Sequence, residues 1–408
     1  MGNLIFHIDV NSAFLSWEAV YRLQVLGETD DLREIPSAVG GDAKKRHGII
    51  LAKSPLAKQY GVRTGDSISN ALKLCPELVL VPPRHDLYEI NSRAFVEILK
   101  EFSPCVEQCS IDEAYCDMSG TLGLYGSAIE AANIIKDRIY QKLGFTVNVG
   151  ISSNKVLAKM ASDFKKPNLV HTLFPDEIEQ KLWKLPVEEL FYVGRATKKK
   201  LNELGILTIG ELAKTDLNIL RSHFKKYADI IHSFANGIDI SMVSEDSSPN
   251  KGYGNSTTTS FDVDKEGAAK MVLLSLCEKT AARLRADAVK ATVVAVELVN
   301  FEFHRTTHQT TLLSATNTTN EIHTAACRLF DELWDGTPIR KLGVHTSKVV
   351  CNESSSQLNL FDMNRNEKLS KLDTAVDEVR ERFGKNAIFR ASFLNNSAPP
   401  NSKISEQE

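Results

Sequence analysis

Hydrophobic and polar positions follow two spacings along this chain, and together they predict an α+β protein. Short apolar runs and strict alternation are typical of buried strands, whereas apolar residues three or four positions apart are typical of helices. The first pattern predicts strands at 4–10, 48–52, 110–118 and 145–151. The second predicts helices at 12–25, 56–60, 68–74, 88–102 and 154–164. Ser127 and Glu130 have the spacing of a capping box, which predicts a further helix that Gly144 ends.

The pattern changes after residue 170 and again after residue 253. Residues 171–240 are mostly helical in pattern, with two glycine-bearing turns around a short helix at 198–204. Residues 241–253 are polar and lack periodicity, which indicates a linker. Beyond the linker, the pattern predicts a strand-helix-strand-strand-helix-strand domain with one open sheet face. Its predicted elements are 256–263, 266–286, 289–300, 304–313, 320–333 and 339–350.

Composition describes an ordinary soluble protein of several domains. The 408 residues are 42% hydrophobic and carry a net charge of -3, so overall charge gives no sign of a nucleic-acid partner. No apolar run approaches the ~20 residues that cross a bilayer, and the N-terminus lacks a basic signal-peptide region. Seven scattered cysteines with no matching histidine set indicate reduced thiols and no zinc site. We therefore expect a cytoplasmic protein without a membrane partner.

Three acidic residues stand at the edges of predicted strands. Asp9 follows the apolar run 4–8, while Asp112 and Glu113 lie at the start of the strand predicted around 110–118. Buried carboxylates are costly unless a cation meets them, and three together provide the oxygen ligands that Mg²⁺ prefers. Two such ions can clamp the attacking and leaving oxygens of a phosphoryl transfer. Taken singly, each residue could instead be a capped or exposed acid.

These segments, with their flanks, resemble the Y-family DNA polymerases, the lesion-bypass enzymes related to DNA polymerases IV and V. The resemblance rests on Ser110-Ile111-Asp112-Glu113-Ala114-Tyr115 and on the Gly-Ile-Ser-x-Asn-Lys-x-x-Ala-Lys pattern of 150–159. It implies a right-hand polymerase: a palm whose antiparallel or mixed sheet is backed by helices, small inserted fingers, a helical thumb with a helix-hairpin-helix, and a β-α-β-β-α-β little finger. The implied bounds are palm 1–18 and 82–170, fingers 19–81, thumb 171–240, linker 241–253, little finger 254–350 and tail 351–408.

The resemblance assigns roles around two Mg²⁺ ions. Asp9 and Asp112 match residues that bridge both ions, Glu113 completes the primer-side ion, and the Val10 carbonyl completes the nucleotide-side ion. Asp112 and Glu113 share a site only if the backbone bends there, since neighbours on a strand face opposite ways. Phe14 matches the steric gate against ribonucleotides. An ordinary core role is the alternative for that ring.

The implied phosphate contacts depart in places from the family pattern. Lys166 matches the lysine that reaches the triphosphate of the nucleotide. In the fingers, Pro55 replaces the family's tyrosine and Lys58 its arginine, so Lys58 offers a point charge without a bidentate fork. This departure resembles a Gram-positive subgroup nearer the polymerase V type. Tyr192 replaces a glycine that is usual in the first hairpin of the thumb.

Several further positions are candidate DNA contacts. Lys155 and Lys159, separated by four residues, form one stripe with Lys166 if the helix continues, and could equally be a solvated face. Turns of the thumb can present backbone amides to phosphate. The implied contacts are Lys155, Lys159, Gly194, Lys198, Gly205 and Gly210. On the little finger, Thr306, His308 and Thr310 alternate along one strand face, which either follows a duplex or is merely solvated.

The tail carries a separate signal. Residues 357–361 match the Gln-x-x-Leu-Phe form of bacterial sliding-clamp ligands, in which an extended peptide docks in an apolar cleft. The implied contacts are Gln357, Leu358, Leu360 and Phe361. An apolar stripe from Leu369 to Phe383 then predicts a helix that packs on this protein's own surface, with recruitment of a partner as the alternative.

The sequence thus predicts a template-directed, low-fidelity polymerase for translesion synthesis. Its expected partners are primer–template DNA, deoxynucleoside triphosphates and a sliding clamp, with accessory repair subunits as further candidates. One alternative is a catalytically feeble, DNA-binding subunit that recruits others, which Pro55 and Tyr192 motivate. A metal-dependent nuclease is disfavoured, because the sequence pattern offers no histidine base beside the acids.

Overall fold

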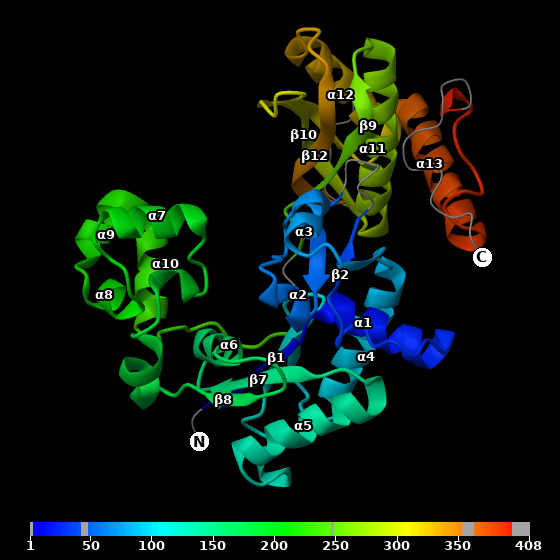
Figure 1. The fold of residues 1–408 in the computed structure, drawn as a ribbon. Helices are drawn as coiled ribbons and strands as arrows, with labels where there is room; N and C mark the ends of the chain where they lie inside the picture. Colours follow the sequence, from blue (N-terminus) through cyan, green and yellow to red (C-terminus); the bar gives the residue numbers. More distant parts are fainter. Residues whose placement is uncertain (1–2, 42–47, 246–248, 353–362, 394–408) are drawn as a thin grey trace. The chain divides into compact units, whose positions relative to one another are not determined.

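The computed structural model describes residues 3–41, 48–245, 249–352 and 363–393, and these fall in two compact units (Figure 1). The first unit lies within residues 1–247 and the second within 248–408.

A five-stranded sheet forms the centre of the first unit, in the order β5-β6-β1-β7-β8. All its neighbours run antiparallel except β7 and β8. The strands are β1 (Ile5–Val10), β5 (Val106–Gln108), β6 (Glu113–Asp117), β7 (Val147–Ser152) and β8 (Val170–Thr172). The predicted strands at 4–10 and 145–151 are confirmed. The strand predicted at 110–118 begins only at Glu113, because a turn occupies the residues before it.

Helices cover both faces of this sheet. Phe6, Ile8 and Val10 pack into the large apolar core with α4 and α5, whereas His7 on the opposite face of β1 meets α6. Ser127 and Glu130 form the predicted capping box at the start of α5. The helices around the sheet are α1 (Ala13–Tyr21), which continues as a π-helical turn (Arg22–Leu26), α4 (His85–Lys100), α5 (Ala128–Leu143) and α6 (Lys155–Asp163).

A small three-stranded sheet lies between β1 and α4 in sequence, in the order β3-β2-β4. It has its own core, in which Ile50, Ala57 and Ile68 are buried. The predicted strand at 48–52 and both short helices are confirmed. The elements are β2 (Ser37–Gly40), β3 (Ile50–Lys53), α2 (Pro55–Gln59), α3 (Ile68–Leu74) and β4 (Val79–Val81).

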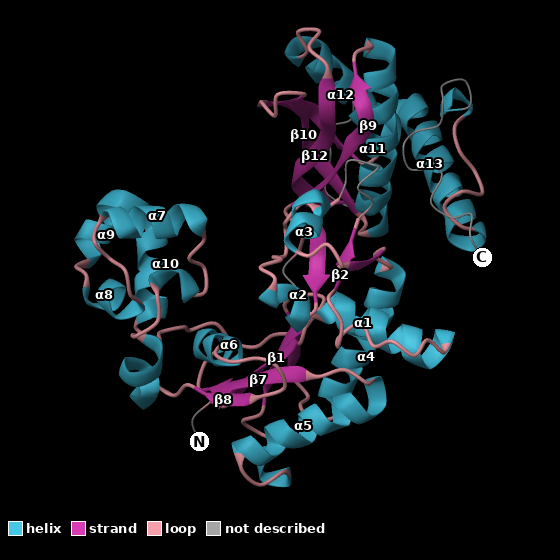
Figure 2. Cartoon of the chain, in the orientation of Figure 1, coloured by secondary structure: helices cyan, strands magenta, loops and turns pink. Residues whose placement is uncertain are grey.

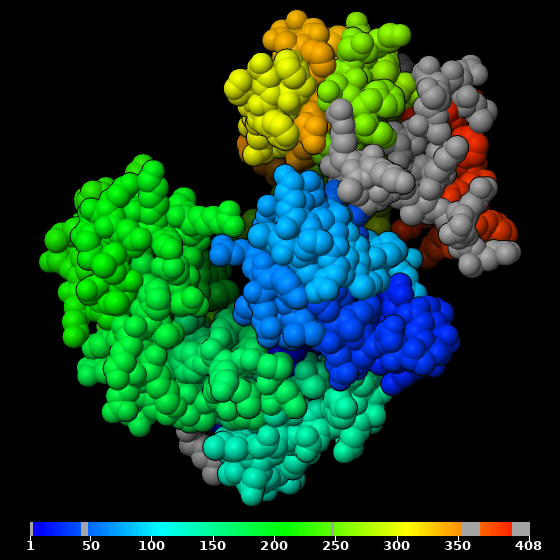
Figure 3. Space-filling view, viewed as in Figure 1, coloured from blue at the N-terminus to red at the C-terminus, as the bar shows by residue number. Residues whose placement is uncertain are grey.

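Residues 171–240 form a helical cluster with its own apolar core, which includes Leu201, Ile209 and Ile231. In the space-filling view this cluster is one continuous packed mass (green, Figure 3). Its α-helices are α7 (Arg195–Glu203), α8 (Ile209–Lys214), α9 (Leu217–Phe224) and α10 (Lys226–Ala235). Short 3-10 or π-helical turns occur at Leu122–Leu124, Pro175–Glu177, Ile178–Leu182, Val187–Glu189 and Ala391–Phe393.

The second unit confirms the predicted strand-helix-strand-strand-helix-strand order. Its four-stranded antiparallel sheet has the order β11-β10-β12-β9, and helices α11 and α12 pack on one face of it (Figure 2). The elements are β9 (Gly252–Val263), α11 (Glu266–Ala286), β10 (Val289–Asn300), β11 (Arg305–Thr316), α12 (Thr319–Leu333) and β12 (Ile339–Cys351).

The prediction that Thr306, His308 and Thr310 line the open sheet face is wrong. In the register, Thr310 and His308 are partners of Val294 and Val296, whose side chains are buried under the helices. Cross-strand partners share a face, so these residues lie on the helix side. His308 accordingly forms an ion pair with Glu332 of α12 at 3.2 Å. The alternate residues Arg305, Thr307 and Gln309 belong to the open face.

The tail helix α13 (Met363–Phe383) packs on α11, which confirms the packing interpretation over a free helix. Polar contacts hold it there. Arg285 of α11 forms ion pairs with Asp377 at 2.6 Å and with the buried Asp373 at 3.3 Å. Of the predicted apolar stripe, Leu372 and Phe383 remain exposed.

Candidate active site

The register between β1 and β6 brings two of the predicted acids together. Asp9 and Glu113 are direct partners across the strands, and the Val10 amide donates to the Asp112 carbonyl at 3.0 Å. Asp112 lies in the turn before β6, where its carboxylate accepts a hydrogen bond from Ser110 Oγ at 2.7 Å. The predicted backbone bend at Asp112 is therefore present. Asp9 and Glu113 therefore lie side by side at one end of β1 and β6, and Asp112 is in the adjoining turn.

Two lysines reach into this acidic group. Lys159 Nζ lies 2.8 Å from Glu113 Oε1 and 3.5 Å from Asp9 Oδ2. Lys166 Nζ lies 3.0 Å from Asp9 Oδ2, and both lysines also pair with Asp163. Their positive charges offset the carboxylates that would otherwise repel one another. Asp9 and Glu113 thus each have a lysine as an ion-pair partner within the fold.

Burial and these neighbours move the pKa values of the two partnered acids apart. Burial raises the pKa of Asp9 to about 7, against the opposing charges of Lys166 and Lys159. Burial also disfavours the charged form of Glu113, but contacts with His7 and Lys159 outweigh it and hold the pKa of Glu113 well below its usual range. A proton shared by this pair therefore resides on Asp9.

The placement of the lysines corrects the predicted DNA stripe. The side chain of Lys159 is only 9% exposed and lies among the acids, so it is not available to a DNA backbone. Lys155 is similarly engaged, with Glu107 Oε1 at 2.7 Å. Helix α6 ends at Asp163, so Lys166 is not on the helical stripe and reaches Asp9 from the following loop.

Phe14 lies at the start of α1, five residues after Asp9. Its half-buried ring stacks on Tyr88 with centroids 4.5 Å apart and an interplanar angle of 12°. Ser12, the N-cap residue of α1, has a left-handed backbone with φ of 48°, which turns the chain from β1 into the helix. The ring is therefore fixed by packing close in sequence to the acids, as a gate requires.

Lys58 is exposed on α2, and Ser54 caps that helix by accepting from the Ala57 amide at 3.0 Å. Pro55 occupies the first turn of the helix, where its missing amide costs nothing. Sequence analysis missed Lys53, which lies close enough for its pKa to be lowered, first by burial and then by the charge of Lys58. The two lysines form a basic pair on one side of the small sheet.

The helical cluster keeps the predicted turns despite Tyr192. That residue adopts φ of 77°, the left-handed conformation that glycine adopts more readily. Gly194 is the N-cap of α7, and Gly205 has φ of 79° just beyond its end. The first amides of α7 consequently point out of the helix end, where they can meet an anion.

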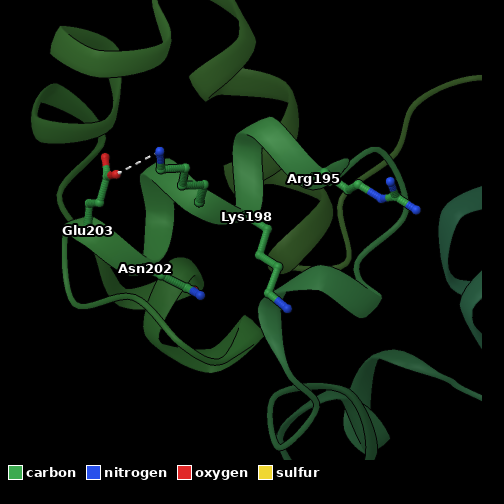
Figure 4. Close-up of a pocket in the computed structure, with 5 residues that line it drawn as sticks. Arg195, Lys198, Asn202 and Glu203 are labelled. Carbon is green, nitrogen blue, oxygen red and sulfur yellow. Dashed lines mark ion pairs between the residues drawn. The ribbon is translucent and has the colours of Figure 1, made fainter.

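One side of α7 is basic. Figure 4 shows Arg195, Lys198 and Asn202 on this helix, where they line a shallow depression together with Lys199 and Glu203. Lys198 pairs with Glu188, and Lys199 lies 4.0 Å from Glu203. Gly210 does not belong to this surface: it is buried against Trp183, and its amide donates to the Trp183 carbonyl at 3.0 Å. Gly210 therefore has a packing role in place of the predicted DNA contact.

A histidine does lie beside the acids, which the sequence pattern did not indicate: His7 Nε2 is 3.5 Å from Glu113 Oε2. The ring is fully buried and faces no solvent, so it is not placed to activate a water for a nuclease. The clamp-motif residues Gln357, Leu358, Leu360 and Phe361 lie outside the described residues.

Comparison with known proteins accounts for nearly the whole chain. Models of the impB/mucB/samB family match residues 8–163, its C-terminal domain matches 250–360, and the HHH motif of the IMS family matches 175–206. A solved Y-family DNA polymerase chimera superposes with a TM-score of 0.74 at 24% identity, covering 86% of this chain and all of the other. That likeness supports the right-hand polymerase fold.

Curated relatives share this full length. A DNA polymerase IV of Clostridium acetobutylicum is 45% identical over 97% of this chain and 99% of its own. DNA polymerase IV 2 of Bacillus subtilis is 37% identical over 96% of this chain and 94% of its own. In the part of the chain that the structure describes, no helix has the length and apolarity to cross a bilayer. The chain belongs to the impB/mucB/samB family, the Y-family DNA polymerases of the DNA polymerase IV type.

Proposed function

We propose that this protein extends a primer on template DNA, including damaged template, by nucleotidyl transfer at Asp9, Asp112 and Glu113. The observation that carries the proposal is the pairing of Asp9 with Glu113 across β1 and β6, with Asp112 in the adjoining turn. Family membership supplies the reaction class. We infer domain bounds as the sequence pattern has them: palm 1–18 and 82–170, fingers 19–81, thumb 171–240, linker 241–253, little finger 254–350 and tail 351–408.

The donor set fits two Mg²⁺ ions. Carboxylate oxygens of the three acids and the Val10 carbonyl are hard oxygen ligands, and Asp9 and Glu113 already have cationic partners in Lys159 and Lys166. Bound magnesium would activate the primer hydroxyl and stabilise charge on the phosphates. The chain's own contribution is to hold the acids at the ends of two rigid strands.

The remaining nucleotide contacts follow from the same geometry. Ion pairs with Asp9 and Asp163 position Lys166, whose ammonium group would contact the triphosphate. Lys58, beside Lys53, would add a second positive charge from the fingers. The ring of Phe14 would lie under the sugar and exclude a ribose 2′-hydroxyl. Its stacking on Tyr88 supports this role, because a ring that excludes the 2′-hydroxyl by steric clash has to be held in a fixed position.

Primer–template DNA would contact two basic surfaces. In the thumb, the amides after Gly194 and the turn at Gly205 would meet phosphates, and Lys198 would be released from Glu188 to do the same. In the little finger, Arg305, Lys341 and His345 surround the buried Glu297 on the open sheet face, at 2.5, 2.9 and 3.8 Å. Arg305 and Lys341 outweigh the single acid, which leaves a net positive centre there.

We further propose that residues 357–361 bind a bacterial sliding clamp, and that accessory repair subunits act with the protein. The support is the Gln-x-x-Leu-Phe pattern of that segment and the departure at Pro55, which weakens the nucleotide cover. In sequence the segment lies between β12 and α13, and clamp ligands of this form dock as extended peptides.

Primer extension with Mg²⁺ tests the proposal. Asp112→Ala should abolish extension on undamaged and abasic templates, because it removes a shared ligand of both ions. Asp137→Ala, at an exposed position of α5, is the matched control and should extend like wild type. Equal extension by wild type and Asp112→Ala would mean that a contaminant carries the activity. Shortening of the primer would favour a nuclease instead.

A further inference from the structure

A buried nitrogen lies behind the acids without a hydrogen-bond partner. His7 is fully buried, and its Nδ1 is hydrogen-bonded to Ser162 Oγ at 2.8 Å. Its Nε2 has no hydrogen-bond partner in the described part of the chain, and the nearest carboxylate oxygen, Glu113 Oε2, is 3.5 Å away. Buried polar atoms are nearly always satisfied, so an unpaired nitrogen aimed at a carboxylate needs an explanation.

A thiol completes the surroundings of this nitrogen. Cys109 Sγ contacts the Glu113 carbonyl at 3.3 Å, and one ligand atom each from His7, Cys109 and Glu113 lies within 4.8 Å of the other two. The two oxygens of Glu113 face different neighbours. Oε1 accepts from Lys159 at 2.8 Å, whereas Oε2 faces His7. A cation between His7 and Cys109 would therefore approach the oxygen that Lys159 does not use.

We propose that His7, Cys109 and Glu113 form a site for a borderline-soft divalent cation of the Zn²⁺ class. Imidazole, thiolate and carboxylate are the donors that Zn²⁺ selects, and Mg²⁺ avoids the first two. At zinc–ligand distances of about 2.0–2.3 Å, tetrahedral ligand atoms are about 3.3–3.8 Å apart. His7 Nε2 and Glu113 Oε2 already have this separation at 3.5 Å, and a pair at the 4.8 Å limit would need to close by about 1 Å. Binding displaces the thiol proton to solvent and satisfies the unpaired nitrogen.

The site shares Glu113 with the magnesium centre, and this consequence rests on the proposed function. A soft cation would hold the carboxylate on the His7 side and withdraw it from the primer-side ion. Zn²⁺ would then inhibit extension even at saturating Mg²⁺, by occupying a position that Mg²⁺ does not fill. The chain would carry a built-in sensitivity to soft metals beside its catalytic acids.

Cobalt provides a test that does not depend on activity. Full-length, metal-free protein titrated with Co²⁺ should develop a thiolate-to-cobalt charge-transfer band at one equivalent, and Zn²⁺ should remove it. Cys109→Ser, which keeps the shape of the side chain, should lose the band and bind Zn²⁺ at least ~10-fold more weakly, the least expected from loss of even a supporting contact. Cys105→Ser, four residues earlier, should keep the band. Absence of the band in wild type, or its persistence in Cys109→Ser, would overturn the site.

Extension assays test the shared carboxylate. At saturating Mg²⁺, Zn²⁺ should inhibit wild type at least ~10-fold more strongly than Cys109→Ser, the same factor as the difference in zinc affinity, when each protein is compared with its own zinc-free rate. Equal sensitivity of the two proteins would overturn the competition. If neither protein extends a primer while the cobalt band forms as expected, the metal site stands and the proposed polymerase function fails.

Discussion

At the scale of single residues, Lys159 and Lys166 explain how Asp9 and Glu113 can lie side by side before any substrate arrives. Each lysine bridges Asp9 and a second carboxylate, with closest distances of 2.8 Å for Lys159 and 2.9 Å for Lys166. Removing one partner of such a buried pair typically costs several kcal/mol, whereas an incoming cation can replace the lysine charge. In the proposed reaction these lysines would hold the acids in place in the free protein and give way to the incoming cations.

Phe14 offers a prediction at the same scale. Its ring is held by Tyr88, so truncation to alanine opens space without removing a charge or a hydrogen bond. Phe14→Ala should raise the ratio of kcat/KM for ribonucleotides to that for deoxynucleotides, on the order of 10²-fold, the discrimination that one shaped pocket achieves. Phe14→Tyr keeps the ring and is the control. Unchanged sugar discrimination in the alanine variant would leave Phe14 with a packing role only.

At the scale of elements, the contact between β7 and α6 positions the lysines. Gly150 of β7 lies so close to α6 that an added Cβ would be 2.0 Å from the Ala158 carbonyl oxygen and 2.4 Å from the Ser162 amide. Gly150→Ala must push the helix away and should destabilise the protein by about 2–3 kcal/mol, the upper range for overpacking. Urea unfolding measures this. Gly123→Ala, with no atom within 4 Å of the added Cβ, should stay near wild type. Equal midpoints for the two variants would contradict the tight contact.

The docking of α13 gives a second prediction for an element. Asp373 is buried, accepts from the Thr319 amide at 2.7 Å and pairs with Arg285. Asp373→Ala leaves the Thr319 amide unpaired and removes one of the two ion pairs of Arg285, so it should weaken docking by about 2 kcal/mol, or roughly 30-fold in opening. Hydrogen exchange within α13 should rise accordingly, while exchange in β10 should not. As a control, Glu378→Ala replaces an exposed residue of the same helix. Unaltered exchange in Asp373→Ala would mean that other contacts hold the helix.

Local patterns predicted most elements, because their signals lie within a few residues. The capping box at Ser127 needs only its own turn, and the order of elements in the second unit follows from periodicity. Contacts between distant segments gave no such signal. The face of Thr306 depends on register with β10, and the lysine contacts of Asp9 join residues about 150 positions apart. The ligand group around His7 was missed for the same reason, although its place two residues before Asp9 on the same strand face was a usable signal.

At the scale of the whole molecule, the distribution of charge over the surface is more informative about DNA binding than the net charge. The chain has 49 Lys and Arg against 52 Asp and Glu, which alone would repel a polyanion. Several cationic side chains form ion pairs within the fold, as Lys155 does with Glu107 and Arg285 with Asp377. Exposed cations are gathered on α7 and on the open face of the β9–β12 sheet. DNA affinity should therefore come from a few local contacts.

Salt dependence of primer–template binding tests this distribution. Each phosphate contact releases condensed counterions, so log Kd should rise linearly with log salt, with a slope set by the number of contacts. Lys199 is 81% exposed on α7 and only loosely paired, at 4.0 Å from Glu203. Lys199→Ala should weaken binding on every template sequence and lower the slope by about 1. Lys142→Ala, which removes an exposed lysine of α5 paired with Glu101 at 2.6 Å, is the control and should leave the slope intact. A flat salt response in wild type would show that these lysines are merely solvated, and the same loss of slope in both variants would show that α7 has no special role in contacting DNA.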